Sequence, residues 1–539
     1  MKKTWWKEAV IYQIYPRSFK DTNGDGIGDL NGVIEKLDYL VELGIDIIWI
    51  CPMYKSPNID NGYDISDYQD IMEVMGTMAD FDRLLAEVHA RGMKLVIDLV
   101  LNHTSDEHPW FIESRSSKKN AKRDWYVWRD EPTNWESIFS GPAWAFDERT
   151  RQYYLHLYAQ KQPDVNWENP ELRRALYDMT NWWLDKGIDG FRIDAISHIK
   201  KDYTDMPNPE GRDYVPAWGK MTDVEGVLDF LVELRDETFA KYDVMTVGEA
   251  NGVTTDELEE WIGEENGVMN MLFQFETWYL RKLDEPCGVN IDALRDVLTR
   301  WQEAAEGIAW NALYVENHDR SRIVSTWGDD HVYWRESATS IAFMYFFMQG
   351  TPFIYQGQEI GMTNAPFNDI ILYDDVKTLN LYRYKKAEGM DHDAIMEMIK
   401  MSSRDHSRTP MQWHGSSYAG FSTAQPWLNL NPNYTWLNVE AQLPDPLSVL
   451  NIYKRMIALR KENEVLIYGT YKLFETPYSC VYAYTREDET AKMLVVSNHK
   501  DDPLKWTAPD GATLLLDNYG SEDANKLRPF EARLYQLRK

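Results

Sequence analysis

Acidic and basic side chains recur where short apolar stretches of the sequence end, and such side chains can act as nucleophiles and general acids. The clearest stretch is Gly190-Phe-Arg-Ile-Asp194, in which Phe191 and Ile193 alternate with Arg192 and Asp194. Arg and Asp are seldom buried without partners, so the pair indicates either a functional site or a structural ion pair. Taken alone, the two interpretations carry similar weight.

Side chains of the same kinds follow other apolar stretches. Asp98 and Glu249 each end one, Asn102-His103 comes shortly after the stretch that Asp98 ends, and His318-Asp319 comes shortly after another. For each residue singly, a surface or ion-pair role explains the sequence equally well. For all of them to follow strands by chance is much less credible, so the set predicts one shared site.

Converging carboxyl groups raise one another's pKa, so one acid can stay protonated near neutral pH while another is ionised. Glycosidic bond cleavage needs such a pair. Asp194, beside Arg192, suits the nucleophile, and Glu249, without an adjacent cation, suits the general acid/base. Neutral His103 and His318 would donate hydrogen bonds to sugar hydroxyls. A metal site is the alternative, ranked lower because no tight ligand spacing is present.

These residues need strands whose ends meet at one face. Apolar residues recur at helical spacing over 30–41, 81–88 and 172–183, and each run is followed by a glycine and then by an apolar strand. Eight strands are predicted, at 9–15, 46–51, 94–98, 190–194, 244–248, 269–273, 312–315 and 352–355. Alternation of this kind favours a (β/α)8 TIM barrel, in which active sites lie at the carboxyl ends of the strands. No Gly-x-Gly-x-x-Gly follows the first strand, which argues against a dinucleotide-binding sheet.

Two long interruptions and a change of pattern divide the chain. Residues 104–169 are polar and Trp-rich, which predicts a small domain inserted after strand three. The barrel would comprise 1–103 and 170–466, with a long excursion over 358–446 after strand eight. Short alternating strands over 467–539 predict a C-terminal antiparallel β-sandwich.

Composition limits the partners. The 539 residues carry a net charge of −30, which argues against nucleic acid or an anionic membrane as partner. The charge says nothing positive about the ligand, and it is the pair of acids that indicates a small oligosaccharide substrate. Cys51, Cys287 and Cys480 have no disulfide or metal spacing. The first residues lack a signal peptide, and the longest apolar run, 341–348, is too short to span a bilayer. We expect a cytoplasmic monomer or small homo-oligomer without an organic cofactor.

Four segments resemble the short motifs of the α-amylase superfamily, glycoside hydrolase family 13: Asp98-Leu-Val-Leu-Asn-His103, Gly190-Phe-Arg-Ile-Asp194, Val247-Gly-Glu249 and Asn317-His-Asp319. Gln162-Pro-Asp-Val-Asn-Trp167 resembles a motif of its oligo-1,6-glucosidase and α-glucosidase branch, with Val165 where Leu is usual. The resemblance implies hydrolysis with retention through a covalent glucosyl-Asp194, with Glu249 as general acid/base. It also implies that Asp319 stabilises the transition state.

The same resemblance implies a set of substrate-binding residues. Asp64, His103, Arg192 and His318 would line the subsite for the terminal glucose, and Tyr63 would stack beneath the sugar. A further family segment, 403–413, would close this subsite. Of its two arginines, Arg404 is the better candidate than Arg408 for contact with sugar.

The residue after the nucleophile borders the next sugar in this branch. Enzymes that prefer α-1,6 bonds typically have Val there, whereas this chain has Ala195, and Ala195 with Asn251 resembles the exo-acting α-1,4-glucosidases. We therefore expect an α-glucosidase that prefers maltose and malto-oligosaccharides. One small side chain shifts specificity by only ~1–3 kcal/mol, so oligo-1,6-glucosidase activity stays open. Transglucosylation or sucrose isomerisation also stays open, although the loop after Asp319 lacks the Arg-Asp pair usual in the isomerases.

A glycine-rich acidic loop precedes the first helix. Asp21, Asn23, Asp25 and Asp29, with the main-chain oxygen of Ile27, place oxygen atoms at alternate positions, as in an EF-hand. The closing Glu is missing, and a solvated Asx-Gly turn is the alternative. Similar enzymes hold a cation in this loop, so we expect a structural Ca²⁺ or Mg²⁺ there.

Overall fold

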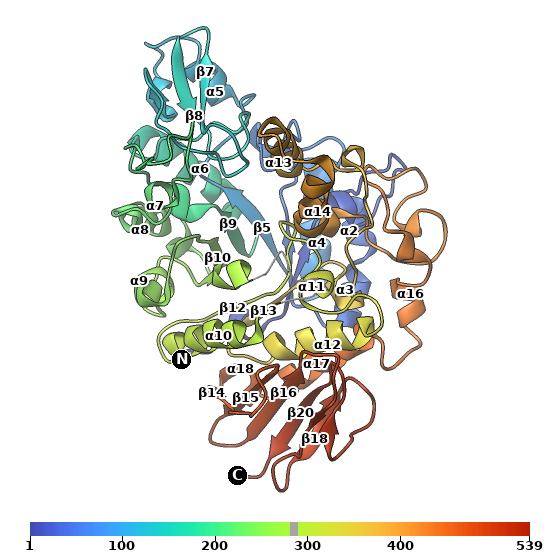
Figure 1. Ribbon diagram of the computed structural model, residues 1–539. Helices are drawn as coiled ribbons and strands as arrows, with labels where there is room; N and C mark the ends of the chain where they lie inside the picture. The colour runs from blue at the N-terminus through green and yellow to red at the C-terminus, as the bar shows by residue number, and fades with distance from the viewer. Residues whose placement is uncertain (281–288) are drawn as a thin grey trace.

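The computed structural model in Figure 1 describes residues 1–280 and 289–539. Its centre is a parallel sheet in the order β11-β10-β9-β5-β2-β1-β13-β12. The end strands β11 and β12 contact each other, so the sheet closes round into the predicted (β/α)8 barrel. The strands are β1 (Ile11–Ile14), β2 (Ile47–Ile50), β5 (Lys94–Val100), β9 (Gly190–Asp194), β10 (Met245–Glu249), β11 (Met271–Phe273), β12 (Ala312–Leu313) and β13 (Thr351–Tyr355).

The strand register brings the polar residues of the site side by side. Asp98 of β5 is paired with Arg192 of β9. Ile193 of β9 is paired with Gly248 of β10, so Asp194 and Glu249 occupy the next position of these two strands. Hydrogen bonding between strands therefore sets the spacing of the acids before any loop contributes.

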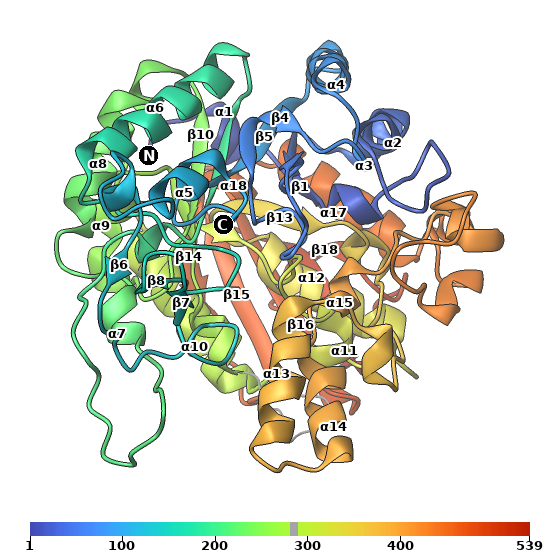
Figure 2. The ribbon, with the colours of Figure 1, turned by 90° about the horizontal axis from the view of Figure 1, so that it is seen from above.

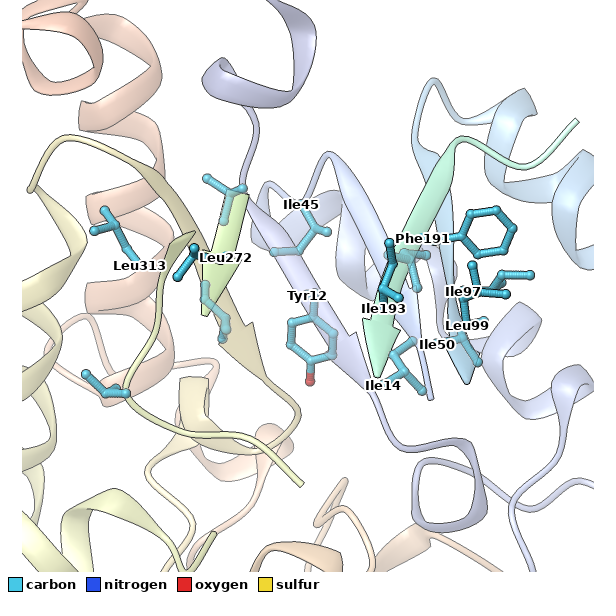
Figure 3. Packing of buried hydrophobic residues seen from close by; sticks show 14 of the residues in the cluster. Tyr12, Ile14, Ile45, Ile50, Ile97, Leu99, Phe191, Ile193, Leu272 and Leu313 are labelled. Atoms are coloured by element: carbon cyan, nitrogen blue, oxygen red, sulfur yellow. The ribbon is translucent and has the colours of Figure 1, made fainter. Parts of the chain in front are cut away.

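Alternate residues of the strands pack into two cores. The core between barrel and helices includes the residues labelled in Figure 3: Tyr12, Ile14, Ile45, Ile50, Ile97, Leu99, Phe191, Ile193, Leu272 and Leu313. The barrel interior includes Ile11, Ile47, Trp49, Val96, Met245, Val247 and Phe353. Because side chains alternate with a period of two, Asp98, Arg192, Asp194 and Glu249 continue the interior series toward the carboxyl ends. The strands are thus apolar on both sides except where the site begins.

Helices with one apolar face cover the barrel. Thr77 and Asp80 form a capping box that starts α4, and α6 begins with Pro after the Asn169 cap. The apolar run over 30–41 forms two helices that meet at Lys36, not one. The main helices are α2 (Leu30–Glu35), α3 (Leu37–Leu43), α4 (Met78–Ala90), α6 (Pro170–Asp185), α8 (Val227–Glu237), α10 (Ile291–Ala305), α12 (Trp334–Phe346) and α17 (Val449–Glu462). Shorter helices are α1 (Trp5–Glu8), α7 (Trp218–Met221), α9 (Leu258–Ile262), α11 (Ile323–Trp327), α16 (Val439–Gln442) and α18 (Val465–Tyr468).

Two segments stand over the carboxyl ends of the barrel strands. Between β5 and β9 the chain forms α5 (Pro109–Ser114) and a small antiparallel sheet of β6 (Trp128–Arg129), β8 (Gln152–Leu155) and β7 (Trp144–Asp147). After β13 it forms the helical pair α13 (Val376–Ala387) and α14 (His392–Ser402), followed by α15 (Asp405–Arg408). Figure 2 shows this pair reaching outward beside the inserted segment. The domain limits proposed from the sequence stay predictions.

The C-terminal region is antiparallel, as predicted. Five strands follow the order β14-β15-β16-β20-β18, and β17 (Leu504–Lys505) pairs with β19 (Lys526–Leu527). The five are β14 (Thr470–Leu473), β15 (Val481–Glu487), β16 (Lys492–Asn498), β18 (Thr513–Asp517) and β20 (Ala532–Leu537). Helix α12 packs on β16 and β20, which fixes this sheet to the barrel (Figure 1).

The cysteines that the structure describes, Cys51 and Cys480, are buried free thiols. Cys287 lies outside the described residues. Within the described ranges, no helix is both long and apolar enough to cross a membrane.

Candidate active site

The carboxyl ends of the strands open into a cavity of about 220 Å³. Its lining changes from buried to open: Tyr63 and Arg404 are 4% and 5% exposed, whereas Trp218 and Tyr279 are 41% and 73% exposed. We call Asp60, Tyr63, His103, Asp319 and Arg404 the buried end, and Trp218, Trp278, Tyr279 and Lys377 the mouth. Asp194 and Glu249 also line the cavity. The acids of the predicted site therefore share one pocket.

A single guanidinium group holds three carboxyl groups together. Arg192 Nη1 lies 2.6 Å from Asp98 Oδ1 and 2.6 Å from Asp194 Oδ1, and its Nη2 lies 2.9 Å from Glu249 Oε2. The Arg192 guanidinium also lies 5.4 Å from the centre of the Trp49 ring, which forms part of the barrel interior. Arg192 does not itself line the cavity. It orients the two acids from within the barrel.

Burial gives Asp194 and Glu249 different charges at neutral pH. Burial raises the pKa of Glu249 to about 8, helped by the nearby Asp194 and Asp319 and opposed by Arg192. Burial also raises the pKa of Asp194, but only to about 6, because Arg192 opposes the shift both by its charge and by a hydrogen bond to this carboxylate. At neutral pH Glu249 is therefore mostly protonated and Asp194 mostly ionised. This is the charge state expected of a general acid facing a nucleophile.

Asp319 is held ionised by two arginines. Burial alone would raise its pKa, but the charges of Arg404 and Arg408 hold that pKa well below its usual range. Arg404 Nη1 and Arg408 Nη2 lie 3.0 and 2.9 Å from Asp319 Oδ1. A permanent negative charge at the buried end favours a sugar ring that develops positive charge.

His318 is oriented from behind. Burial lowers the pKa of His318 to about 3, so the ring is neutral. The Gln13 amide donates to His318 Nδ1 at 2.7 Å, which places the ring proton on Nε2. This Nε2 lies 3.2 Å from Asp319 Oδ2, and within the described ranges it makes no hydrogen bond. His318 also stacks on Tyr63 with ring centres 5.2 Å apart, although His318 itself does not line the cavity.

His103 lines the buried end and is also neutral, because burial lowers its pKa to about 4. The Asn102 amide contacts His103 Nδ1 at 3.2 Å, and the Gln162 amide contacts Nε2 at 3.2 Å. Behind them, the Lys201 ammonium lies 2.9 Å from both Asn102 Oδ1 and Asp164 Oδ2. The motif around Gln162 thus fixes the orientation of His103.

Asp64, like Arg192 and His318, does not line the cavity, contrary to the sequence-based expectation. Asp64 is fully buried and accepts the backbone N–H groups of Ile59 and Asp60. It shapes the loop so that Asp60 lies in the pocket, where Arg404 Nη2 and Gln162 Nε2 donate to its carboxylate at 2.8 and 3.1 Å. Both residues lie in an irregular loop, whose geometry the residue types alone did not reveal.

Ala195 has a left-handed backbone, with φ of 47°, immediately after Asp194. Its N–H donates to Glu249 Oε2 at 3.1 Å, so the turn connects the two acids. Ala195 does not line the cavity, whereas Asn251 does. The backbone conformation adds a reason for a small, unbranched residue, because a β-branched side chain is strongly disfavoured at positive φ.

Sequence reasoning missed most of the mouth. Phe275, Trp278 and Tyr279 come from the segment after β11, and Lys377 comes from the start of α13. The aromatic run beyond Phe273 was an available signal, since flat rings suit sugars. Lys377 had none, because its place depends on how the excursion folds back.

The acidic loop that leads into α2 does not form an evident metal site. Its oxygen donors suit a hard cation. However, Asp21 accepts the N–H groups of Asn23, Gly24 and Gly26, Asp25 accepts that of Ile27, and Asp29 caps α2. Throughout the described residues, no three acidic, histidine or cysteine side chains converge in a way that could hold a metal. The cation stays a prediction, which elemental analysis of the purified protein tests.

Comparison with known proteins identifies the family. The model described as "Alpha amylase, catalytic domain" matches residues 13–469. The chain belongs to the alpha-amylase family. This alpha-amylase family member is 54% identical over 556 residues to the probable oligo-1,6-glucosidase 3 of Bacillus subtilis (strain 168), covering 99% of this chain and 100% of that protein. It is 50% identical over 566 residues to the oligo-1,6-glucosidase of Parageobacillus thermoglucosidasius, with 100% of both chains covered.

Its fold also matches a solved structure of an isomaltulose synthase from Erwinia rhapontici NX5, with a TM-score of 0.94, 41% identity and full coverage of both chains. Family membership and these relatives establish that the protein is a glycosidase.

Proposed function

We propose that this glycosidase is a retaining, exo-acting α-glucosidase that prefers α-1,6 bonds and releases glucose from isomaltose-type oligosaccharides. The observation that carries the chemistry is Arg192, which holds Asp194 and Glu249 at 2.6 and 2.9 Å from the two arms of its guanidinium. A nucleophile and a proton donor held this way face the same cavity with different charge. The full-length similarity to two oligo-1,6-glucosidases supports the linkage.

The reaction follows from the two charge states. The Asp194 carboxylate attacks the anomeric carbon while Glu249 gives its proton to the glycosidic oxygen, so the aglycone leaves as an alcohol. The glucose is then an ester of Asp194. Glu249, now a carboxylate, removes a proton from water, and the water oxygen displaces Asp194. Glucose leaves with its α configuration, and both acids return to their initial state.

The buried end of the cavity supports exo action. Asp60, His103, Asp319 and Arg404 offer hydrogen-bond partners deep in the pocket, and among the described lining residues the exposed ones, such as Trp218 and Tyr279, belong to the mouth. A terminal glucose can enter up to this end, and the next sugar must lie toward the mouth. A chain could not pass through, so cleavage in the middle of a long polymer is disfavoured.

The preferred linkage differs from the main expectation drawn from the sequence. Ala195 and Asn251 resemble α-1,4-preferring enzymes, but the relatives favour the α-1,6 alternative. Similarity to an isomaltulose synthase adds a second candidate, in which a sugar captures the glucosyl intermediate. That candidate uses the same first step and differs only in the acceptor.

Product analysis tests the proposal. The purified enzyme should release glucose from isomaltose with a higher kcat/KM than from maltose, and from sucrose it should yield no isomeric disaccharide as main product. A maltose preference of tenfold or more contradicts the linkage. Isomaltulose as the main product from sucrose supports the second candidate. Asp391→Asn, a substitution on the outer end of α14, is the matched control for handling and purity.

A further inference from the structure

Asp375 occupies two roles at the start of α13. It is the N-cap of that helix, and its carboxylate accepts the N–H groups of Lys377 and Thr378 at 3.2 and 3.1 Å. The Thr378 hydroxyl donates to it at 2.7 Å and also contacts the Ser403 hydroxyl at 2.9 Å. The Asp375 side chain is fully buried and does not line the cavity. A helix cap alone would explain these contacts but not the next ones.

The same carboxylate binds the guanidinium that forms the buried end. Arg404 Nε and Nη2 lie 2.9 and 2.6 Å from Asp375 Oδ1. Arg404 Nη1 lies 3.0 Å from Asp319 Oδ1, and Nη2 also lies 2.8 Å from Asp60 Oδ1; Asp319 and Asp60 both line the cavity. Arg404 thus touches three carboxylates, one behind it and two in front.

Other contacts fix the same fork. The Arg404 guanidinium lies 4.7 Å from the centre of the Phe139 ring, which belongs to the inserted segment. Asp405 Oδ2 accepts the backbone N–H groups of Asp374 and Asp375 at 2.8 and 3.0 Å. The start of α13 and the segment that carries Arg404 are therefore joined by both side-chain and backbone hydrogen bonds.

We propose that Asp375 is a positioning residue of the active site: it holds Arg404 so that Asp60 and Asp319 stand where the terminal glucose binds. This rests on the proposed α-glucosidase function. Two guanidinium groups, Arg404 and Arg408, here face three carboxylates, Asp60, Asp319 and Asp375. Without the charge of Asp375, the Arg404 guanidinium is attracted toward its two carboxylate partners in the cavity, Asp60 and Asp319. The shift changes the position from which these two carboxylates accept sugar hydroxyls.

The cap and the ion pair can be separated by substitution. Asn and Ser cap helices about as well as Asp does, so Asp375→Asn and Asp375→Ser keep the start of α13 while removing the charge that binds Arg404. Asp391 provides a matched control, because it caps α14 through the Asp393 N–H on the exposed side of the same helical pair. Asp391→Asn therefore tests the cap without the arginine.

The measurements are kcat/KM on 4-nitrophenyl α-glucoside and the inhibition constant of free glucose. For Asp375→Asn and Asp375→Ser we expect kcat/KM to fall about 10- to 100-fold and the glucose inhibition constant to rise at least about fivefold, the range for a lost charged hydrogen bond. Asp391→Asn should stay within about twofold in both. Near-unchanged glucose binding in both Asp375 variants, with intact thermal unfolding, overturns the proposal.

A double-mutant cycle separates positioning from general weakening. If Asp375 acts through Arg404, Asp375→Asn should change kcat/KM by less than about threefold in an Arg404→Gln background, because interacting residues are not additive. Full additivity overturns the proposal. Should Arg404→Gln not fold, the glucose inhibition constants of the two single Asp375 variants still decide. An unmodified enzyme that fails to cleave the aryl glucoside would instead refute the proposed function.

Discussion

The buried end and the mouth of the cavity are built on different principles. At the buried end, Asp60, Asp319 and Arg404 are tied to each other by charged hydrogen bonds. At the mouth, Trp278 stacks with Arg320 at 3.8 Å, and Tyr279 is largely exposed. The first arrangement can recognise one sugar in one orientation. The second offers flat surface to sugars of several shapes. Under the proposed function, we therefore assign linkage preference to the mouth and glucose recognition to the buried end.

The largest effect should come from the nucleophile between the two regions. Asp194→Ala removes the group that forms the glucosyl ester, so kcat on isomaltose and on aryl α-glucosides should fall by at least about 10⁴-fold. Steady-state kinetics measures the loss, and circular dichroism checks the fold. Substantial turnover by this variant would mean that another group attacks the anomeric carbon.

The buried end should respond strongly to a single neutral substitution. Asp60→Asn weakens the contacts with Arg404 and Gln162 and with sugar hydroxyls, so kcat/KM should fall about 100-fold with little change in Tm. Asp64→Asn should do the reverse, because Asp64 serves two backbone N–H groups outside the cavity. It should lower Tm by several degrees and kcat/KM by less than Asp60→Asn. Equal kinetic losses would erase the distinction between these neighbours.

The pH dependence reports the two acids. Asp194 must be ionised, so kcat/KM should fall below about pH 6, the pKa to which burial raises it. Glu249 must be protonated, so the rate should also fall above about pH 8. The two limbs belong to the interacting pair and are read from a kcat/KM profile. Glu249→Gln should abolish the alkaline limb, and a limb that persists would have another source.

The smallest effect should appear at the turn that leads to the mouth. Ala195→Val places a β-branched residue at φ of 47°, which should cost about 1–2 kcal/mol of stability and lower Tm. Because the α-1,6-preferring enzymes that the motif resembles typically carry Val at this position, the same change should raise the isomaltose-to-maltose ratio of kcat/KM about three- to tenfold. Competition between the two disaccharides measures the ratio. An unchanged ratio would place linkage selection at Asn251 or at the aromatic residues.

The strand pattern was sufficient to predict the barrel and the acids. Apolar alternation over β9 and β10 put Arg192, Asp194 and Glu249 on one face, because a strand has a fixed period of two. Local patterns could not place loop residues. Asp60 lies in the cavity in place of Asp64, and Lys377 lies at the mouth, because of the way in which long irregular segments fold back onto the barrel. No clear signal in the sequence indicates that the helix predicted over 30–41 divides into α2 and α3 at Lys36, since the apolar spacing continues across this residue.

Strand β9 lies between β5 and β10 and carries both Arg192 and Asp194, while β10 carries Glu249. The relative placement of the two acids is therefore set by the register of the sheet, before the loops above it contribute. Relatives could exchange the inserted segment or the α13–α14 pair and keep the same reaction centre. Such exchanges offer a direct route to engineering new acceptor preferences while the reaction centre stays unchanged.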